Sequence, residues 1–190
     1  MAPRSQIDIV RAAVRGDRAA LETLWQLERR RVAAVLLAHR PREEDLEDLL
    51  QEVGTILVER IGEVREPERF RAWLRTVALN VARGAGRRAR FTRDHARSLE
   101  AAAEVPDPNA AAGTLRVEAH EELRQVVAWV RGMSPSYAEP LLLRAVWGLS
   151  QQEIAEWLAI PETTVETRLA RARRMLRERI EESDRLRRAE

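Results

Sequence analysis

The sequence predicts an all-α protein made of two small helical domains that are joined by a flexible linker. Apolar residues recur at helical spacing along most of the 190-residue chain, and strand signals are nearly absent. The composition changes over residues 98–113, which are rich in alanine and proline and contain the turn sequence PDPN. We therefore expect a first domain over residues 1–97, a linker over 98–115 and a second domain over 116–190.

Three helices are expected in the first domain. Asp17 can cap a helix over residues 18–38, and further helices should cover residues 43–61 and 70–84, the last continued by the basic sequence GRRARFTR. A loop over 62–68 separates the second helix from the third. Apolar residues three and four positions apart should face the core: Leu21, Leu24, Trp25, Val32, Leu46, Leu49, Leu50, Val53, Ile56, Leu57, Trp73, Leu74, Val77 and Val81.

The second domain should contain helices around residues 123–130 and 141–146, followed by a helix-turn-helix. Residues 149–177, LSQQEIAEWLAIPETTVETRLARARRMLR, have the pattern of two helices joined by a tight turn. Ser150 and Glu153 form a capping box at the start of the first of these helices. Pro161 indicates the turn, because its ring fixes φ and restricts the residue before it.

The second helix of this pair should start near Glu162 and separate an apolar stripe from a polar face. The stripe consists of Val165, Leu169, Ala172 and Leu176. Threonines and arginines off the stripe favour a helix that enters the DNA major groove, although a solvated basic face on an ordinary helical hairpin has the same pattern. The arginine-rich end of this helix should fray after Ile180.

Charge is segregated along the chain, although the formal net charge is only +2. Residues 43–59 contain seven carboxylates and no arginine, whereas residues 69–93 contain eight arginines and no carboxylate. All 33 basic residues are arginine, whose planar guanidinium suits phosphate and guanine. Such blocks indicate one basic and one polyanionic partner, or else two solvated faces.

The composition argues against catalysis, metal binding and membrane insertion. The chain has no cysteine and no apolar run approaching the roughly 20 residues that span a bilayer, so we expect a cytoplasmic protein without disulfides. Asp45, Asp48 and Glu52 lie on one predicted helix without a nearby histidine, and the three histidines are scattered. We therefore expect no catalytic residue, no metal site and no cofactor.

Four motifs in a fixed order resemble those of a known family. They are GDRAALETLW from Gly16, DLLQEV from Asp48, FRAWLRTVALNVAR from Phe70, and the helix-turn-helix sequence. Together they cover nearly the whole chain, and their order and spacing are similar to those of extracytoplasmic-function (ECF) sigma factors of bacterial RNA polymerase. The resemblance implies a protein that binds core RNA polymerase, recognises two promoter elements and helps to open the DNA at initiation.

The resemblance assigns the acidic helix to the clamp helices of the largest polymerase subunit. The assigned residues are Asp45, Asp48, Leu49, Gln51 and Glu52. Asp48, Gln51 and Glu52 are spaced i, i+3 and i+4, so one helical face can present them to arginines of a partner. Without the resemblance, a solvated face with intrahelical ion pairs would be the preferred interpretation.

The resemblance assigns the basic helix to the −10 promoter element and the preceding loop to a pocket for a flipped-out base. The assigned residues are Val64, Arg65, Arg71, Arg75, Asn80, Arg83, Arg87 and Arg88. The arginines would neutralise phosphates, and Asn80 would hydrogen-bond a base edge or serve a polar role within the helix. The loop contains no aromatic residue to stack on a base, so promoter specificity should differ from that of better-known relatives.

The second domain is assigned to the −35 element and to the β flap of the polymerase. The assigned DNA contacts are Thr164, Glu166, Thr167, Arg168 and Arg171, of which the two arginines are the strongest candidates. Three residues depart from the family pattern. Glu166 replaces a basic residue, Ala159 replaces a glycine and needs a negative φ or some strain, and Pro140 should shorten or kink its helix.

Two further expectations concern partners. Many relatives are held inactive by an anti-sigma protein, so an anti-sigma factor is a candidate partner beside core polymerase and promoter DNA. The alternative function is a conventional dimeric helix-turn-helix regulator that binds operator DNA without polymerase. Binding of the free chain to duplex DNA would distinguish the regulator from the sigma factor.

Overall fold

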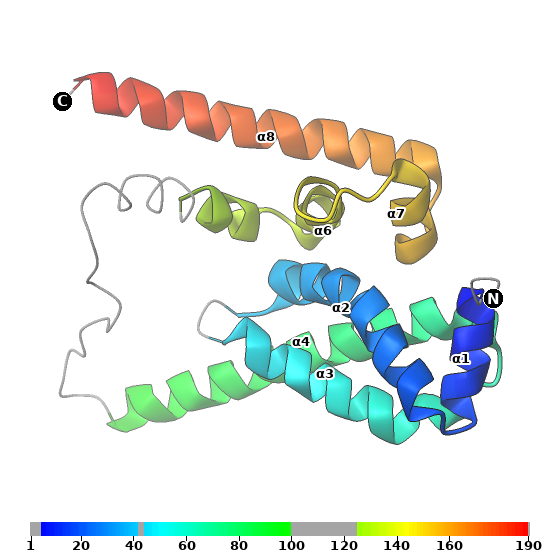
Figure 1. Ribbon diagram of the computed structural model, residues 1–190. Coiled ribbons are helices and arrows are strands. Elements are labelled where there is room, and N and C mark those ends of the chain that lie inside the picture. Colours follow the sequence, from blue (N-terminus) through cyan, green and yellow to red (C-terminus); the bar gives the residue numbers. More distant parts are fainter. Residues whose placement is uncertain (1–4, 42–43, 100–124, 190) are drawn as a thin grey trace, which may run out of the picture.

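The structure, a computed structural model, describes residues 5–41, 44–99 and 125–189 (Figure 1). Within these ranges the chain forms helices and turns and no strand, which confirms the predicted all-α class. We call the described residues up to 99 the first domain and those from 125 the second domain. The predicted linker over 98–115 lies outside the described residues except for its first two, which end a helix.

The first domain consists of four α-helices and two short 3₁₀ helices. They are α1 (Gln6–Val14), α2 (Arg18–His39), α3 (Leu46–Arg60), η1 (Ile61–Glu63), η2 (Pro67–Arg69) and α4 (Phe70–Leu99). Asp17 caps α2 as predicted, since its carboxylate accepts the backbone N–H groups of Ala19 and Ala20. The short helix α1, which packs against α2, was not predicted.

The acidic helix α3 begins three residues later than predicted, at Leu46. Asp45 caps it, because its carboxylate accepts the N–H groups of Glu47 at 2.7 Å and Asp48 at 3.4 Å. A capping residue needs an extended backbone, and Asp45 has φ −74° and ψ 139°. Asp45 therefore ends the preceding loop.

The second domain contains a helix over residues 125–132 and three further helices: α6 (Pro135–Ala145), α7 (Gln151–Leu158) and α8 (Glu162–Ala189). Pro140 lies inside α6, which begins five residues earlier, so the expectation of a shortened helix is wrong. The expected fraying after Ile180 is wrong as well. Ion pairs such as Arg179–Glu182 (3.4 Å) support the distal half of α8, which also lines a hollow with the helix over 125–132.

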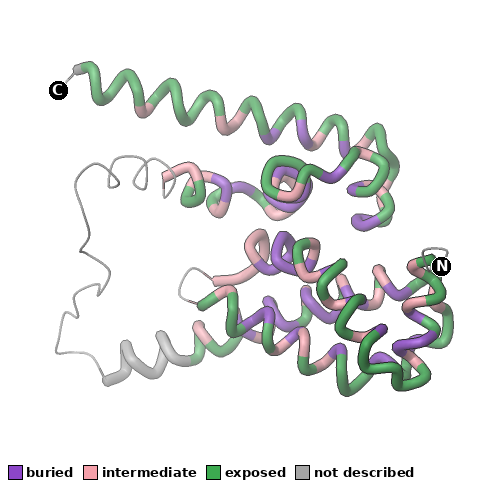
Figure 2. The backbone as a smooth tube through the Cα atoms, viewed as in Figure 1, coloured by how far each residue is buried: buried purple, intermediate pink, exposed green. Residues whose placement is uncertain are grey.

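The two domains are in direct contact (Figure 1). α6 contacts α2 and α8, and α7 contacts α4 and α8, so α6 and α7 lie between α8 and the first domain. One buried apolar cluster extends through both domains and includes Leu24 and Leu74 of the first and Trp157 of the second. Figure 2 shows buried segments in the helices of both domains. The helices of the first domain thus share a core with the helix-turn-helix.

Most of the residues predicted to face the core are fully buried. Five of them are only partly buried and pack against the edge of the cluster: Leu21, Trp25, Leu46, Ile56 and Trp73. Trp157 is 1 % exposed but was not among the predicted core residues. It lies on α7 together with the buried residues Ile154 and Leu158, so the buried face of α7 includes an aromatic ring.

The helix-turn-helix has the predicted start and a strained turn. Ser150 Oγ accepts the N–H of Glu153 at 3.2 Å, and the Glu153 carboxylate accepts the N–H of Ser150 at 2.8 Å, which completes the capping box. The hydrogen bonds that the backbone N–H and the hydroxyl of Ser150 donate to this carboxylate lower the pKa of Glu153. Ala159 ends α7 with φ +54° and ψ 46°, so the left-handed conformation is adopted with a side chain present.

A buried carboxylate joins the two domains. Glu139 of α6 is 2 % exposed, and its oxygens accept hydrogen bonds from Arg75 Nε at 3.1 Å and Arg75 Nη2 at 3.0 Å. His39 Nε2 lies 3.2 Å from the same carboxylate. Burial alone would raise the pKa of Glu139, but the hydrogen bonds with His39 and Arg75 outweigh it and hold the pKa below its ordinary value.

Replacing Ala159 by glycine should stabilise the protein. Left-handed backbone costs an L-residue roughly 1–2 kcal/mol, whereas the extra freedom of glycine in the unfolded chain costs about 0.5–1 kcal/mol. We expect Ala159→Gly to raise the free energy of unfolding by about 0.5–1 kcal/mol in urea titrations. Ala170→Gly, at an exposed position inside α8, is the control and should lower it by about 1 kcal/mol. Equal destabilisation by both substitutions would contradict the strain at Ala159.

The stabilising effect of Glu139 should disappear in acid. A carboxyl whose pKa is lowered by folding contributes stability above its unfolded pKa of about 4.3, and that contribution is lost as the pH falls through the folded pKa. The difference in unfolding free energy between wild type and Glu139→Gln should therefore shrink as the pH falls below about 5. Because Glu139→Gln retains every other carboxylate, the difference between the two proteins reports on Glu139 alone. A difference that does not change with pH would contradict the ion pair.

Candidate nucleic-acid interface

One face of α4 is exposed from Ala72 to Arg90 and carries mainly polar and basic side chains. Its residues recur at intervals of three and four: Ala72, Thr76, Asn80, Arg83, Arg87 and Arg90. Three of the residues predicted to bind DNA, namely Asn80, Arg83 and Arg87, therefore share one face. Arg90 extends this face by one turn and was not predicted. We call the six residues the outward face of α4.

Arg71 and Arg75 point away from this face, toward α2 and the second domain. Arg71 Nε donates to Glu28 Oε1 at 3.2 Å, and Arg71 Nη1 lies 3.6 Å from Glu156 Oε2. The side chains of Arg71 and Arg75 are 29 % and 24 % exposed. Both guanidiniums are therefore paired with carboxylates of this chain, since Arg75 also pairs with Glu139.

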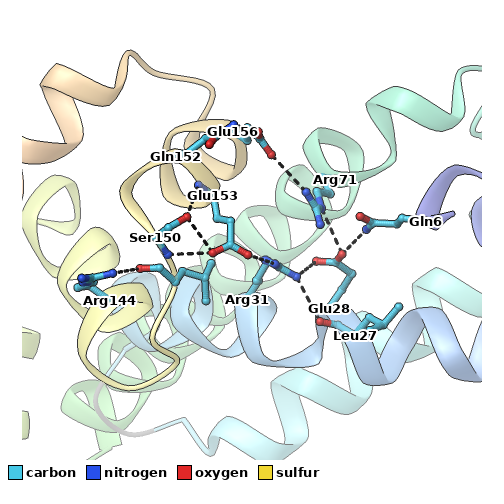
Figure 3. Close-up of polar contacts among 11 residues, drawn as sticks. Gln6, Leu27, Glu28, Arg31, Arg71, Arg144, Ser150, Gln152, Glu153 and Glu156 are labelled. Atoms are coloured by element: carbon cyan, nitrogen blue, oxygen red, sulfur yellow. Dashed lines mark hydrogen bonds and ion pairs between the residues drawn. The ribbon is translucent and has the colours of Figure 1, made fainter. Parts of the chain in front are cut away.

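Glu28 is the centre of a second polar network between the domains (Figure 3). It is 0 % exposed and accepts hydrogen bonds from Gln6, from Arg31 Nη1 at 3.0 Å and from Arg71. Arg31 Nη2 also lies 3.7 Å from Glu153 Oε1, on the helix-turn-helix. The network therefore connects α1, α2 and α4 with α7.

The acidic face of α3 is only partly available to a partner. Asp48 and Gln51 are exposed, as predicted, whereas Glu52 Oε2 accepts a hydrogen bond from Arg88 Nη2 at 3.0 Å. Leu49 is 1 % exposed and packs in the core, so the prediction that it touches a partner is wrong. Asp45 is exposed, but its carboxylate caps the helix.

A shallow groove of about 500 Å³ runs beside the exposed residues of α3. It lies between α2 and α3, and its lining includes Gln51, Trp25, Gly54 and Val58. The Trp25 ring lies over Gly54, where a Cβ would make an ordinary van der Waals contact with it at 3.6 Å. Val58 is 61 % exposed, which gives this polar face an apolar edge.

The loop before α4 is folded into the two 3₁₀ helices. Val64 is 7 % exposed and belongs to the core, so the prediction that its side chain contacts a flipped-out base is wrong. Its burial follows from the turn at η1, where the Val64 N–H donates to Ile61 O at 3.0 Å. Arg65, the other predicted residue of this loop, is exposed.

The outward face of the second helix of the helix-turn-helix differs slightly from the prediction. Val165, Leu169 and Ala172 of α8 are buried, and Glu166, Thr167 and Arg171 are exposed. Two predicted DNA contacts, Thr164 and Arg168, are only partly exposed at the edge of the apolar stripe. Three exposed residues off the stripe were not among the predicted DNA contacts: Thr163, Arg173 and Arg174.

Two side chains of this helix are held by local contacts. Thr167 Oγ1 donates to Thr163 O at 2.9 Å, which leaves its lone pairs as acceptors. The Arg171 guanidinium lies 5.5 Å from the centre of the Tyr137 ring of α6, within the range of a cation–π contact. The role of Tyr137 has no sequence signal, because the two residues are far apart in the chain.

The described residues contain no group of three or more histidine, aspartate or glutamate side chains that could hold a metal ion. None of the helices within the described ranges is both long enough and apolar enough to cross a membrane.

Comparisons with known proteins agree with the two-domain architecture. The family description "Sigma-70 region 2" matches residues 24–92, and "Sigma-70, region 4" matches residues 123–176. RNA polymerase sigma factor NccH of Alcaligenes xylosoxydans xylosoxydans is 28% identical over 174 residues, which cover 88% of this chain and 90% of NccH. Probable RNA polymerase sigma factor RfaY of Xanthomonas campestris pv. campestris is 30% identical over 149 residues, which cover 77% of this chain and 36% of RfaY.

A solved structure has the same fold. The structure of CnrH in complex with the cytosolic domain of CnrY superposes with a TM-score of 0.61 at 24% sequence identity, covering 93% of this chain and 97% of CnrH. Both sigma-70 regions occur in the order that the sequence motifs indicated, and the relative NccH matches over nearly its whole length. The chain belongs to the ECF subfamily of bacterial RNA polymerase sigma factors, which bind core RNA polymerase and direct it to promoters.

Proposed function

We propose that the two domains divide the work of this sigma factor between them. The first domain, over residues 1–97, would dock on the clamp helices of the largest polymerase subunit and bind the −10 element. The second, over residues 116–190, would bind the β flap and the −35 element, and residues 98–115 would connect the two. The observation that carries the proposal is the pair of exposed faces of opposite charge on α3 and α4 of one domain.

Docking on polymerase would use the exposed end of the acidic face. Asp48 and Gln51 offer a carboxylate and an amide to arginines of the clamp helices, and the groove beside them offers Val58 and Trp25 as apolar contacts. Glu52 would contact the clamp helices only if its ion pair with Arg88 were replaced by an ion pair with an arginine of the polymerase. Because this surface ion pair is exposed, its loss costs at most about 1 kcal/mol.

Binding of the −10 element would use the outward face of α4. Arg83, Arg87 and Arg90 follow one another at helical spacing, so they can track successive phosphates of one strand. Asn80, one turn before them, is positioned to read a base edge. Arg65, which is exposed in the loop before the same helix, would contact the flipped-out base or the neighbouring phosphate.

Binding of the −35 element would use the exposed face of α8. Arg171, held against Tyr137, and Arg174 flank Thr167, so guanidinium donors for phosphate lie beside hydroxyl lone pairs that can accept from base amino groups. Glu166 lies on the same exposed side. A carboxylate there repels phosphate and accepts from the amino group of cytosine, so it would narrow the accepted −35 sequence.

Two further assignments follow from the family. CnrH was solved with the cytosolic domain of CnrY, and we propose that an anti-sigma protein binds this chain as well. We also propose that the protein has no catalytic activity of its own and acts in the cytoplasm, where the polymerase transcribes the chromosome.

The activity is tested by transcription in vitro. Purified core polymerase with this protein should produce a specific start from a promoter selected with the holoenzyme from a random DNA library. Core polymerase alone should not produce that start. Absence of any specific start from selected DNA would contradict the proposed function, and tight operator binding by the free chain would favour the dimeric regulator.

Charge reversal at Asp48 should impair docking without unfolding the protein. Asp48→Arg places a cation opposite the arginines of the clamp helices, and we expect a loss of at least about tenfold in affinity for core polymerase. Glu181→Arg is the control, since it makes the same charge change at an exposed site on α8. Pull-down and thermal denaturation are measured together. Unchanged core affinity of a folded Asp48→Arg protein would show that α3 is not the docking surface.

Removal of the Arg171 side chain should weaken promoter binding and leave core binding intact. If Arg171 contacts a base, its loss should weaken the binding free energy by about 1–3 kcal/mol and relax specificity at one base pair. If it contacts a phosphate, its loss should reduce by about one the slope of log affinity against log salt concentration. Arg185→Ala, at the far end of the same helix, is the control. Holoenzyme affinities are measured on promoters with and without a −35 element. Equal losses on both promoters would contradict the assignment of α8 to the −35 element.

A further inference from the structure

The ring of Tyr137 supports the guanidinium of Arg171 where α6 packs on α8. Arg171 Cζ lies 5.5 Å from the centre of the ring. Both residues belong to the second domain, and their two helices are in direct contact. A neighbouring helix therefore holds Arg171, one of the two arginines that are the strongest candidates for contact with the −35 element.

Two buried alanines bring these side chains together. Ala138 of α6 and Ala172 of α8 belong to one buried cluster, and the Tyr137 ring packs against that cluster. The distance between two packed helices depends on the size of the side chains at their contact, so alanines allow a close approach. Tyr137 directly precedes Ala138, and Arg171 directly precedes Ala172. Close packing of α6 on α8 therefore places the ring beside the guanidinium.

The start of α6 fixes the position of the ring. The N–H groups of Tyr137 and Ala138 donate to Ser134 O at 2.8 Å and 3.0 Å. Pro135 begins the helix, where its fixed φ suits the first turn. The tyrosine side chain has only two rotatable angles and is half-buried, so it loses little conformational freedom in this place. Tyr137 is therefore a rigid support for a long and flexible side chain.

The ring holds Arg171 without neutralising it. Within the part of the chain that the structure describes, Arg171 has no ion pair and its side chain has no hydrogen bond. Arg174, on the same helix, lies instead 3.6 Å from Glu178 Oε1. A carboxylate takes up N–H donors and cancels the charge, whereas an aromatic face attracts the cation through its quadrupole. The charge and the N–H donors of Arg171 therefore remain available to DNA.

We propose that Tyr137 is a positioning residue for promoter recognition, which holds Arg171 in the orientation that contacts a guanine of the −35 element. The inference rests on the proposed function of α8. Ordering a long side chain opposes binding, and the ring orders Arg171 before DNA arrives. Exclusion of water by the DNA then strengthens the contact between cation and ring. A guanidinium held in one orientation matches the two acceptors of guanine and cannot turn to follow another base pair, so Tyr137 raises both affinity and discrimination.

The proposal is tested with holoenzyme on a promoter selected by the wild-type protein, with the −35 element intact or scrambled. Tyr137→Leu removes the ring and keeps an apolar side chain, and Tyr137→Phe keeps the ring and removes the hydroxyl. We expect Tyr137→Leu to weaken binding to the intact promoter about two- to tenfold, and to leave binding to the scrambled promoter and to core polymerase unchanged. It should also reduce discrimination at the base pair whose readout Arg171→Ala abolishes. Tyr137→Phe should match wild type.

Two controls separate positioning from packing. Met175→Leu changes another residue that packs against the same cluster, at nearly constant volume, and should match wild type. In the Arg171→Ala background, Tyr137→Leu should have no further effect on promoter affinity. Thermal denaturation accompanies every variant. If Tyr137→Leu unfolds, Tyr137→Gln carries the test, because glutamine is a good helix former and suits a half-exposed site.

Four results would overturn the proposal. Unchanged affinity and discrimination in Tyr137→Leu would show that the ring has no role in binding, and tighter binding would show that the ring withdraws Arg171 from DNA. An equal loss in Tyr137→Phe would assign the effect to the hydroxyl. A loss that persists in the Arg171→Ala background would show that Tyr137 acts through another residue. Failure of the proposed function would appear separately, as an Arg171→Ala protein with undiminished affinity for the intact promoter.

Discussion

The pairing of buried carboxylates with arginines of α4 is the constraint on which the rest of the structure depends. Glu28 and Glu139 are almost completely buried, and an ionised carboxylate in that position is stable only with cationic partners. Arg71 and Arg75 supply the pairing, and both lie on one side of α4. These contacts fix the rotation of α4, so Asn80, Arg83 and Arg87 face outward.

The charge blocks of the sequence therefore serve two purposes. In the basic block, Arg71 and Arg75 bind carboxylates inside the protein, and Arg83, Arg87 and Arg90 remain on an exposed face. In the acidic block, Asp45 caps α3 and Asp48 remains exposed. A count of charges would assign every residue of a block to the same partner. In the structure, some residues of each block stabilise the fold and others remain exposed and available for binding.

Local patterns in the sequence predicted the helices well, because capping residues and apolar spacing act within a few residues. Asp17, Ser150 and the stripe of α8 are examples. Long-range contacts were not predictable. Arg75 and Glu139 are 64 positions apart, and His39 and Glu139 are 100 apart, so no periodicity connects them. Val64 and Leu49 were wrongly predicted to contact partners. The family resemblance assigns a role to a whole segment, whereas neighbouring residues of that segment differ in burial, and these two side chains lie in the core.

A double-mutant cycle on Arg75 and Glu139 tests the central claim most directly. The unfolding free energies of wild type, Arg75→Gln, Glu139→Gln and the double variant are compared in urea at neutral pH. If the two side chains form a buried ion pair across the domains, their coupling energy should be at least about 1 kcal/mol. The loss of unfolding free energy in the double variant should then be smaller than the sum of the losses in the two single variants. Additive losses would show that the domains are not joined by this pair in solution.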